Sequence, residues 1–471
     1  MTLINKLTLN TGIQLGGKLI SLVFGLGVVA LMTRALGQEG FGQYTTIIAF
    51  LQLAGIMVDL GLTVTCGKTI AQGVYNESKL LGNIFSFRTI TAIIVFSLAP
   101  VVAWFFPYPL IIKIGIAVTS LSFLATSLAQ TFGAVFQKYL RTGLFVSAEL
   151  VGRFILLILT AYLAWSVGPL VAFLLAIVVA NLFNLLLVFI FVKKLVRFSW
   201  EIDFSVWQYI WRETWPVALT IALNLVYFKM DTIILSIYRP LAEVGIYGAS
   251  YKVLEILLAL PTIVGGLLLP LITILLVQGS ITQVRRYYVA SLDVMLAAGL
   301  ALIAVCLVMG REAMAFLAGS DFAVAGDVLK VVSVATALIF FGNLIGYFIL
   351  AFGRQKQMIK YYAIAAVVAL VGYFIFIPQY SYWGAAWVTV IIEAFMTGVA
   401  IWILRKQVLP SMVRWPKLIL AAAILGLFLY LINSWPFMVK AISGLIVYPV
   451  LLYLFRVWPR DILFKINQSE G

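Results

Sequence analysis

The sequence predicts an all-α membrane protein with about fourteen transmembrane helices, and three observations lead to this prediction. Hydrophobic residues make up 64% of the 471 residues and charged residues only 10%, against roughly 25% charged in an ordinary soluble domain. Apolar stretches long enough to span a bilayer follow one another almost from end to end, and the connections between them are too short for a soluble domain. Only a closed helix satisfies its own backbone inside lipid, so each stretch predicts a helix.

Each predicted helix covers one apolar stretch. We expect the helices at residues 10–33, 43–65, 84–106, 111–137, 147–165, 169–192, 213–236, 247–274, 289–310, 327–352, 359–377, 384–404, 417–434 and 438–456. Pro261 falls inside the eighth of these helices and predicts a kink there.

A faint internal repeat divides these helices into groups. Residues 34–40 read RALGQEG and residues 239–245 read RPLAEVG, so both show R-x-L-x-x-x-G after the first helix of a group of six. Parallel repeats of this kind recur in transporters. We therefore predict a six-helix bundle over 1–204, a second over 205–408, and two additional helices with a tail over 409–471.

The basic residues fix the orientation. Of the 32 Lys and Arg, 22 fall on one side of the predicted helices, four lie within them, and six fall on the other side, namely Arg34, Lys113, Arg239, Arg311, Lys330 and Lys440. Because cytoplasmic loops carry the excess of Lys and Arg, both termini are predicted to be cytoplasmic. The same distribution explains the net charge of +15 without nucleic acid as a partner.

Several kinds of chemistry are excluded by composition. The chain has no histidine, which removes histidine-ligated metal sites, Ser-His-Asp catalysis and histidine proton relays. Its two cysteines, Cys66 and Cys306, lie far apart in sequence and give neither a disulfide framework nor metal-ligand spacing. We therefore expect no cofactor, no metal and no enzyme activity.

Four cations lie within the predicted helices, at a cost of about 2.5–3.5 kcal/mol each near a helix centre. We predict that Lys18 and Arg153 form an inner substrate-binding station and that Lys229 and Lys252 form an outer one. Lys18 lies too deep to reach the headgroups, which favours a water-filled cavity around it. The structural alternative is that Arg153 pairs with Glu149 four residues away, and Lys252 with Glu255, without contacting substrate.

Four acids within the predicted helices are candidates for a coupling or counter-ion role: Asp59, Asp231, Glu255 and Glu393. Asp59 is a candidate counter-ion of Lys18. Lys229 and Asp231 are two residues apart and point to different faces of their helix. Glu393 has no evident partner in the sequence. Its carboxyl is protonated, paired with a residue of another helix, or functional, and the sequence does not decide between these three.

Several segments resemble the bacterial O-antigen and polysaccharide flippases of the multidrug/oligosaccharidyl-lipid/polysaccharide exporter superfamily. They are RALGQEGFGQY at 34–44, DLGL at 59–62, KMDTIILS at 229–236, EVGIYGASYK at 243–252, GRQK at 353–356 and WGAAW at 383–387. The resemblance implies a V-shaped pair of six-helix bundles plus two helices. It also implies alternating access that flips an undecaprenyl-pyrophosphate-linked oligosaccharide outward across the cell inner membrane.

Two other functions are alternatives to the flippase. A multidrug or cation antiporter of the same superfamily would use Asp59 or Asp231 as its coupling acid, but drug-exporting relatives often carry an acid in the first helix, where this chain has Lys18. A membrane glycosyltransferase or polymerase generally has a large outer loop, and the longest one here, about Arg311 to Gly326, is too small for a domain. The expected partners are a lipid-linked oligosaccharide, membrane lipids, a coupling ion (H⁺ or Na⁺) and polysaccharide polymerase machinery.

The predicted orientation can be tested with single cysteines in a variant that lacks Cys66 and Cys306. An impermeant thiol reagent added from outside should label a cysteine placed at Gln379 and miss one placed at Gln407, because these positions flank the twelfth predicted helix. The reverse labelling pattern would invert the orientation and exchange the inner and outer stations.

Overall fold

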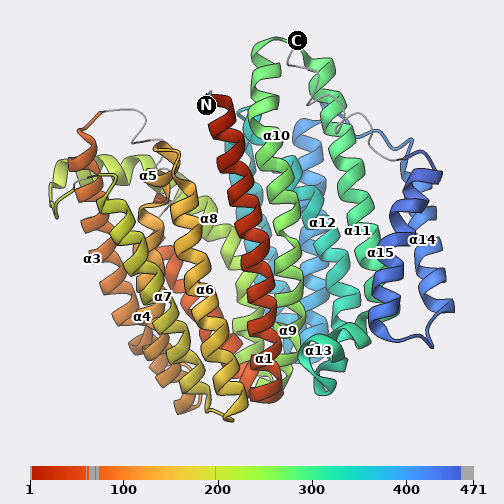
Figure 1. The fold of residues 1–471 in the computed structure, drawn as a ribbon, viewed down its shortest axis with the longest axis horizontal. Helices are drawn as coiled ribbons and strands as arrows, with labels where there is room; N and C mark the ends of the chain where they lie inside the picture. Colours follow the sequence, from red (N-terminus) through yellow and green to blue (C-terminus); the bar gives the residue numbers. More distant parts are fainter. Residues whose placement is uncertain (1–2, 60, 63–68, 70–73, 197, 458–471) are drawn as a thin grey trace. The chain divides into compact units, whose positions relative to one another are not determined.

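The computed structural model describes residues 3–457 except 60, 63–68, 70–73 and 197, and the regular elements of that part of the chain are helices (Figure 1). In chain order they are α1 (Leu3–Asp59), α3 (Glu77–Trp104), α4 (Leu110–Thr131), α5 (Gly133–Lys138), α6 (Thr142–Trp165), α7 (Leu170–Lys193), α8 (Phe204–Tyr238), α9 (Leu241–Leu257), α10 (Ala259–Val277), α11 (Ile281–Ala318), a 3₁₀ helix (Ser320–Val324), α12 (Ala325–Ala351), α13 (Gln355–Leu404), α14 (Trp415–Leu431) and α15 (Phe437–Leu454). The predicted all-α class is confirmed.

Eleven helical stretches of the described chain are long and apolar enough to cross a membrane. Two of them contain a sharp turn, at Gly37 in α1 and at Ser381 in α13, where φ is 64° and 54°. Each therefore corresponds to two of the predicted helices. In α13 the Tyr373 and Thr389 hydroxyls lie 3.2 Å apart across the turn, which shows that the chain reverses there. The shorter apolar helix α14 accounts for the thirteenth predicted helix.

Polar residues and prolines mark the starts of several helices. Asn76 precedes α3 and accepts a hydrogen bond from the Ser78 backbone at 3.0 Å, which satisfies one of the free N–H groups of the first turn. Pro109 and Pro169 precede α4 and α7. The predicted kink near Pro261 is confirmed as a break between α9 and α10, and the proline lies in the first turn of α10, where it is tolerated.

The chain forms two compact units, Met1–Gly245 and Ile246–Gly471. In the first unit, α4 packs against α1, α3 and α7, while α6 packs against α1 and α7. In the second unit, α12 packs against α11 and α13, and α14 packs against α11 and α15. The division predicted after residue 204, and the separate segment from 409, stay predictions.

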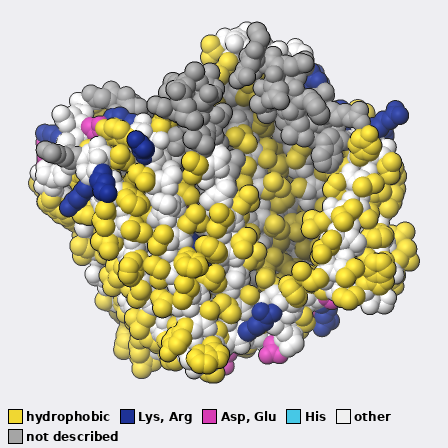
Figure 2. Space-filling model, viewed as in Figure 1, with side chains coloured by type: hydrophobic (Ala, Val, Ile, Leu, Met, Phe, Trp, Pro, Cys, Tyr) yellow, Lys and Arg dark blue, Asp and Glu magenta, His cyan; other side chains and the backbone are white. Residues whose placement is uncertain are grey.

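Hydrophobic side chains cover much of the described surface visible in Figure 2, and most of the visible Lys and Arg lie toward its upper and lower edges. Exposed apolar side chains such as Leu186 (53%) and Phe154 (50%) lie on α7 and α6. A surface of this kind is suited to hydrocarbon rather than water.

The two copies of the sequence repeat lie against one another within the first unit. A Cβ atom added at Gly42 would overlap the carbonyl oxygen of Leu241, and one added at Gly245 would overlap that of Gln38. The backbones of α1 and α9 therefore touch here, which only glycine allows at both positions.

We expect Gly42→Ala and Gly245→Ala to destabilise the protein by about 1–3 kcal/mol or more, because the methyl group has to displace backbone atoms. Gly55→Ala is the matched control on α1, since no atom lies within 4 Å of its added Cβ. Thermal unfolding of the purified protein in detergent measures the difference. Equal unfolding temperatures for the Gly42 and Gly55 variants would contradict the close backbone contact.

Candidate substrate cavity and buried charges

A polar cavity of about 410 Å³ lies within the first unit, between α1, α4, α6 and α7. Hydrogen-bonding side chains from all four helices line it beside apolar ones such as Ile48 and Leu156: Tyr44, Gln52, Ser122, Thr126, Gln130, Glu149, Arg153, Asn181 and Asn184. Such a concentration of amides, hydroxyls and charges inside a bundle of apolar helices is the arrangement expected of a binding site.

Arg153 and Glu149 meet at the α6 wall of this cavity. The Nε atom of Arg153 lies 3.9 Å from Oε1 of Glu149, and the two side chains are 47% and 45% exposed. Glu149 Oε1 also accepts a hydrogen bond from the Ser21 hydroxyl at 3.2 Å. An exposed pair at this distance is weak. The guanidinium has five N–H donors and therefore keeps donors to offer to an anion.

The amide side chains supply neutral hydrogen bonds. Asn181 of α7 donates to the Ser122 hydroxyl of α4 at 2.6 Å, so the two walls are joined across the cavity lining. Gln52 and Asn184 line the same space from α1 and α7. An amide offers both donors and acceptors, as the hydroxyls of a sugar require.

Lys18 lies on α1, is exposed, and is not among the side chains that line this cavity. Gly17 packs against Val146 and Gly27 against Leu157, so this part of α1 runs beside α6 in the same direction. With the two helices aligned in this way, Lys18 on α1 lies beside a position on α6 that is about two turns before Arg153. The two cations are therefore separated by ~9 Å along the helix axis. The structure thus brings the two predicted inner cations to neighbouring helices, at different levels.

Asp59, a predicted candidate counter-ion of Lys18, forms an ion pair with Arg88. Its Oδ1 atom lies 2.7 Å from a guanidinium nitrogen of Arg88 on α3, whose side chain is 1% exposed. Arg88 also donates to the Ser127 hydroxyl of α4 at 3.0 Å. The predicted third helix began at residue 84, which placed Arg88 at its end. In the structure α3 begins at Glu77, and Arg88 lies three turns inside it.

The predicted outer cation Lys229 is half-buried on α8, which packs against α1 and α3 in the first unit. Asp231, two residues further along, is 1% exposed and accepts hydrogen bonds from the backbone and hydroxyl of Thr232. The two side chains therefore have different surroundings.

Lys252 and Glu255 pair with each other on α9 at 2.8 Å, with 23% and 28% of their side chains exposed. This is the i,i+3 contact that their spacing predicts. Glu393, on α13, is 4% exposed, and its Oε1 atom has no hydrogen-bond partner among the described residues.

Two further ion pairs of the second unit fasten its last helices to α11. Asp293, 3% exposed, lies 3.5 Å from Arg414 just before α14. Lys440 of α15 is buried and pairs with Glu312 near the other end of α11. In both pairs the partners are more than a hundred residues apart, so no local sequence pattern indicates them.

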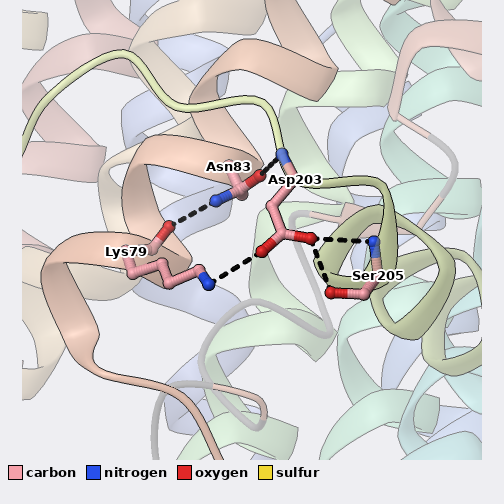
Figure 3. A network of polar contacts seen from close by, with 4 residues as sticks. All are labelled: Lys79, Asn83, Asp203 and Ser205. Carbon is pink, nitrogen blue, oxygen red and sulfur yellow. Dashed lines mark hydrogen bonds and ion pairs between the residues drawn. The ribbon is translucent and has the colours of Figure 1, made fainter.

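A polar network fastens the connection between α7 and α8 to α3 (Figure 3). Asp203 accepts a hydrogen bond from the Ser205 backbone at 2.9 Å as the cap of α8, and its other oxygen lies 2.7 Å from the Lys79 ammonium. Asn83 accepts from the Asp203 backbone at 2.7 Å. The hydrogen bond from Lys79 lowers the pKa of the Asp203 carboxyl. The pair is therefore fully formed above the ordinary Asp pKa of ~3.9 and is lost only at more acidic pH.

The fold is shared with solved membrane transporters. A structure described as lipid II flippase MurJ in an inward closed conformation matches with a TM-score of 0.78 and 14% identity, over 94% of this chain and 99% of that one. The inward-facing conformation of a multidrug resistance MATE family transporter of the MOP superfamily has a TM-score of 0.60 and 13% identity, over 83% and 94%. An outward-facing conformation has a TM-score of 0.55 and 14% identity, over 84% and 95%.

These likenesses show the fold: a multi-pass membrane fold shared by a lipid II flippase and by multidrug resistance MATE transporters. The chain belongs to the polysaccharide biosynthesis protein family, because residues 7–276, more than half of its 471, match the model of that family. The resemblance to polysaccharide flippases of this superfamily is confirmed. No curated protein matches the chain.

The Asp59–Arg88 pair can be tested by a double-mutant cycle. Asp59→Asn should destabilise the protein by about 3–5 kcal/mol, because it leaves a fully buried guanidinium without its counter-charge. The combined Asp59→Asn, Arg88→Met variant should be more stable than Asp59→Asn alone. Thermal unfolding in detergent of Asp59→Asn, Arg88→Met and the combined variant, each against wild type, gives the three values. Simple addition of the two single effects would mean that the pair carries no coupling.

Proposed function

We propose that this protein is a flippase that moves an undecaprenyl-pyrophosphate-linked oligosaccharide, of the kind used for O-antigen, from the cytoplasmic to the outer leaflet by alternating access. One observation supports this proposal most strongly. The match to the polysaccharide biosynthesis family, over residues 7–276, includes every residue that lines the arginine-containing cavity of the first unit. The shared fold with a lipid II flippase supports the same class of cargo.

The chemistry of the cavity suits such a cargo. Arg153 offers a cation for pyrophosphate, since charge-assisted hydrogen bonds to phosphate are strong and Arg suits its geometry. Asn181, Asn184 and Gln52 offer hydrogen bonds for sugar hydroxyls. Lys18, at a different level on the neighbouring helix, receives the pyrophosphate first in this proposal. Lys229 and Lys252 act later, toward the outer leaflet.

The surroundings of the acids speak against a cation antiporter. Asp59 is neutralised by Arg88, and Asp231 is hydrogen-bonded to Thr232. Glu255 is paired with Lys252. If H⁺ or Na⁺ drives transport, Glu393 is the acid we propose for the coupling, because it is buried without an ion-pair partner among the described residues.

We place the protein in the cell inner membrane with both termini in the cytoplasm, on the strength of the basic residues counted above. In this setting the flipped oligosaccharide is released where the polymerase machinery of polysaccharide synthesis would take it up.

The inner station is tested by surface glycan in a flippase-null strain. We expect Arg153→Ala and Lys18→Ala to impair export, since each removes a phosphate contact worth ~1.5–3 kcal/mol. Lys18→Arg should keep part of the export because the charge survives. Lys406→Ala, at an exposed position, is the control, and membrane abundance is measured for every variant. Full export by the Lys18→Ala, Arg153→Ala double variant would refute the station.

The outer station is tested at its ion pair. The Lys252→Gln, Glu255→Met variant removes both charges of this pair together, so that neither of the two stays buried without the other. We expect it to insert normally and to lose export, because Lys252 contacts the substrate in this proposal. If this double variant exported a near-normal amount of surface glycan in the same assay, the Lys252–Glu255 pair would have a structural role only.

A further inference from the structure

A second cavity lies on the first unit, between α3, α4 and α7, and it differs in chemistry from the polar one. Its volume is about 310 Å³, and its lining is apolar: Phe85, Leu128, Leu182, Leu185, Leu186 and Phe189. We call it the apolar groove. Leu128 of α4 is 7% exposed, whereas Leu182 and Leu186 of α7 are 39% and 53% exposed. The groove is therefore open at the surface of a membrane-spanning helix, where hydrocarbon rather than water fills apolar space.

The groove has the dimensions of part of a lipid chain. Its α7 wall runs from Leu182 to Phe189, which is ~10 Å along a helix at 1.5 Å per residue. Phe85 and Phe189 form the end nearest the terminus of α7, with ring centroids 6.3 Å apart.

Two cations lie at that end. The Lys193 ammonium lies 4.4 Å from the ring centroid of Phe189, and Lys194 follows directly; both side chains are exposed. Neither forms an ion pair with any described residue. Because α7 ends at Lys193, these charges lie at the level expected of lipid headgroups. Trp200, 51% exposed, adds an amphipathic ring 6.0 Å from that of Phe85.

We propose that the apolar groove binds an acyl chain of an anionic phospholipid whose phosphate rests on Lys193 and Lys194. The apolar lining selects hydrocarbon, and the two cations select a negative headgroup over a neutral one. This is a lipid site on the outside of the bundle, separate from the polar cavity proposed for the transported glycan, and it does not depend on that function.

Native mass spectrometry of the purified full-length protein tests the site, with phosphatidylglycerol and phosphatidylcholine titrated separately. Phosphatidylglycerol should bind the Lys193→Gln, Lys194→Gln variant ~30-fold more weakly than wild type, from ~1 kcal/mol for each basic residue. Lys360→Gln is the matched control, because Lys360 also lies over an aromatic ring, 4.8 Å from the Tyr361 centroid, and belongs to the second unit. Leu186→Trp should fill the groove and weaken binding with both lysines intact.

The other outcomes each overturn the proposal. Equal losses in the Lys193→Gln, Lys194→Gln and Lys360→Gln variants would mean that the affinity is general surface charge. If phosphatidylglycerol and phosphatidylcholine bound equally well to the wild-type protein, the site would not recognise the charge of the headgroup. Displacement of phosphatidylglycerol by a lower concentration of polyprenyl phosphate would make the groove a site for a carrier lipid instead. Unfolding temperatures check that Leu186→Trp is folded, and unchanged binding by the folded variant would exclude the groove.

Discussion

The constraint on which this structure depends is that a charge among apolar helices needs a partner or a cavity. Arg88 meets it completely: it is buried, paired with Asp59 and bonded to Ser127, so that one guanidinium ties α1, α3 and α4 together. Arg153 meets it only partly, because its contact with Glu149 is long and half exposed. The difference separates a charge that holds helices in place from one that faces a polar cavity and can receive a ligand.

Close backbone contact is the second organising feature. Gly42 and Gly245 let α1 and the start of α9 touch without side chains between them, and they do so beside the two copies of the sequence repeat. A pattern that looked marginal as a string of letters thus corresponds to a physical contact. Gly245, which ends the second copy, is fixed by the neighbouring backbone, as is Gly42, two residues after the first copy. A Cβ added at Gly40, which ends the first copy, would meet the side chain of Leu36 instead.

Much of the fold could be predicted from the sequence, because a membrane-spanning helix is encoded locally by its apolar length. The Lys252–Glu255 pair was also predictable, since partners three residues apart share a helix face. The position of Arg88 was misjudged because α3 begins at Glu77, seven residues before the predicted start at 84. The Asp59–Arg88 pair joins side chains from separate helices, and so does the lining of the polar cavity. A local sequence pattern does not indicate which helices pack together, so neither could be predicted.

The two faces of α7 have a consequence for how this protein tolerates change. Asn181 and Asn184 face the polar cavity, while Leu182, Leu185 and Leu186 face the apolar groove, so that neighbouring residues belong to opposite environments. Inserting or deleting one residue ahead of Asn181 would turn the rest of the helix by about 100°. Amides would then enter lipid and leucines the polar cavity. The spacing within this helix is therefore under a stricter constraint than the identity of most of its side chains, and single-residue insertions should be far rarer there than substitutions.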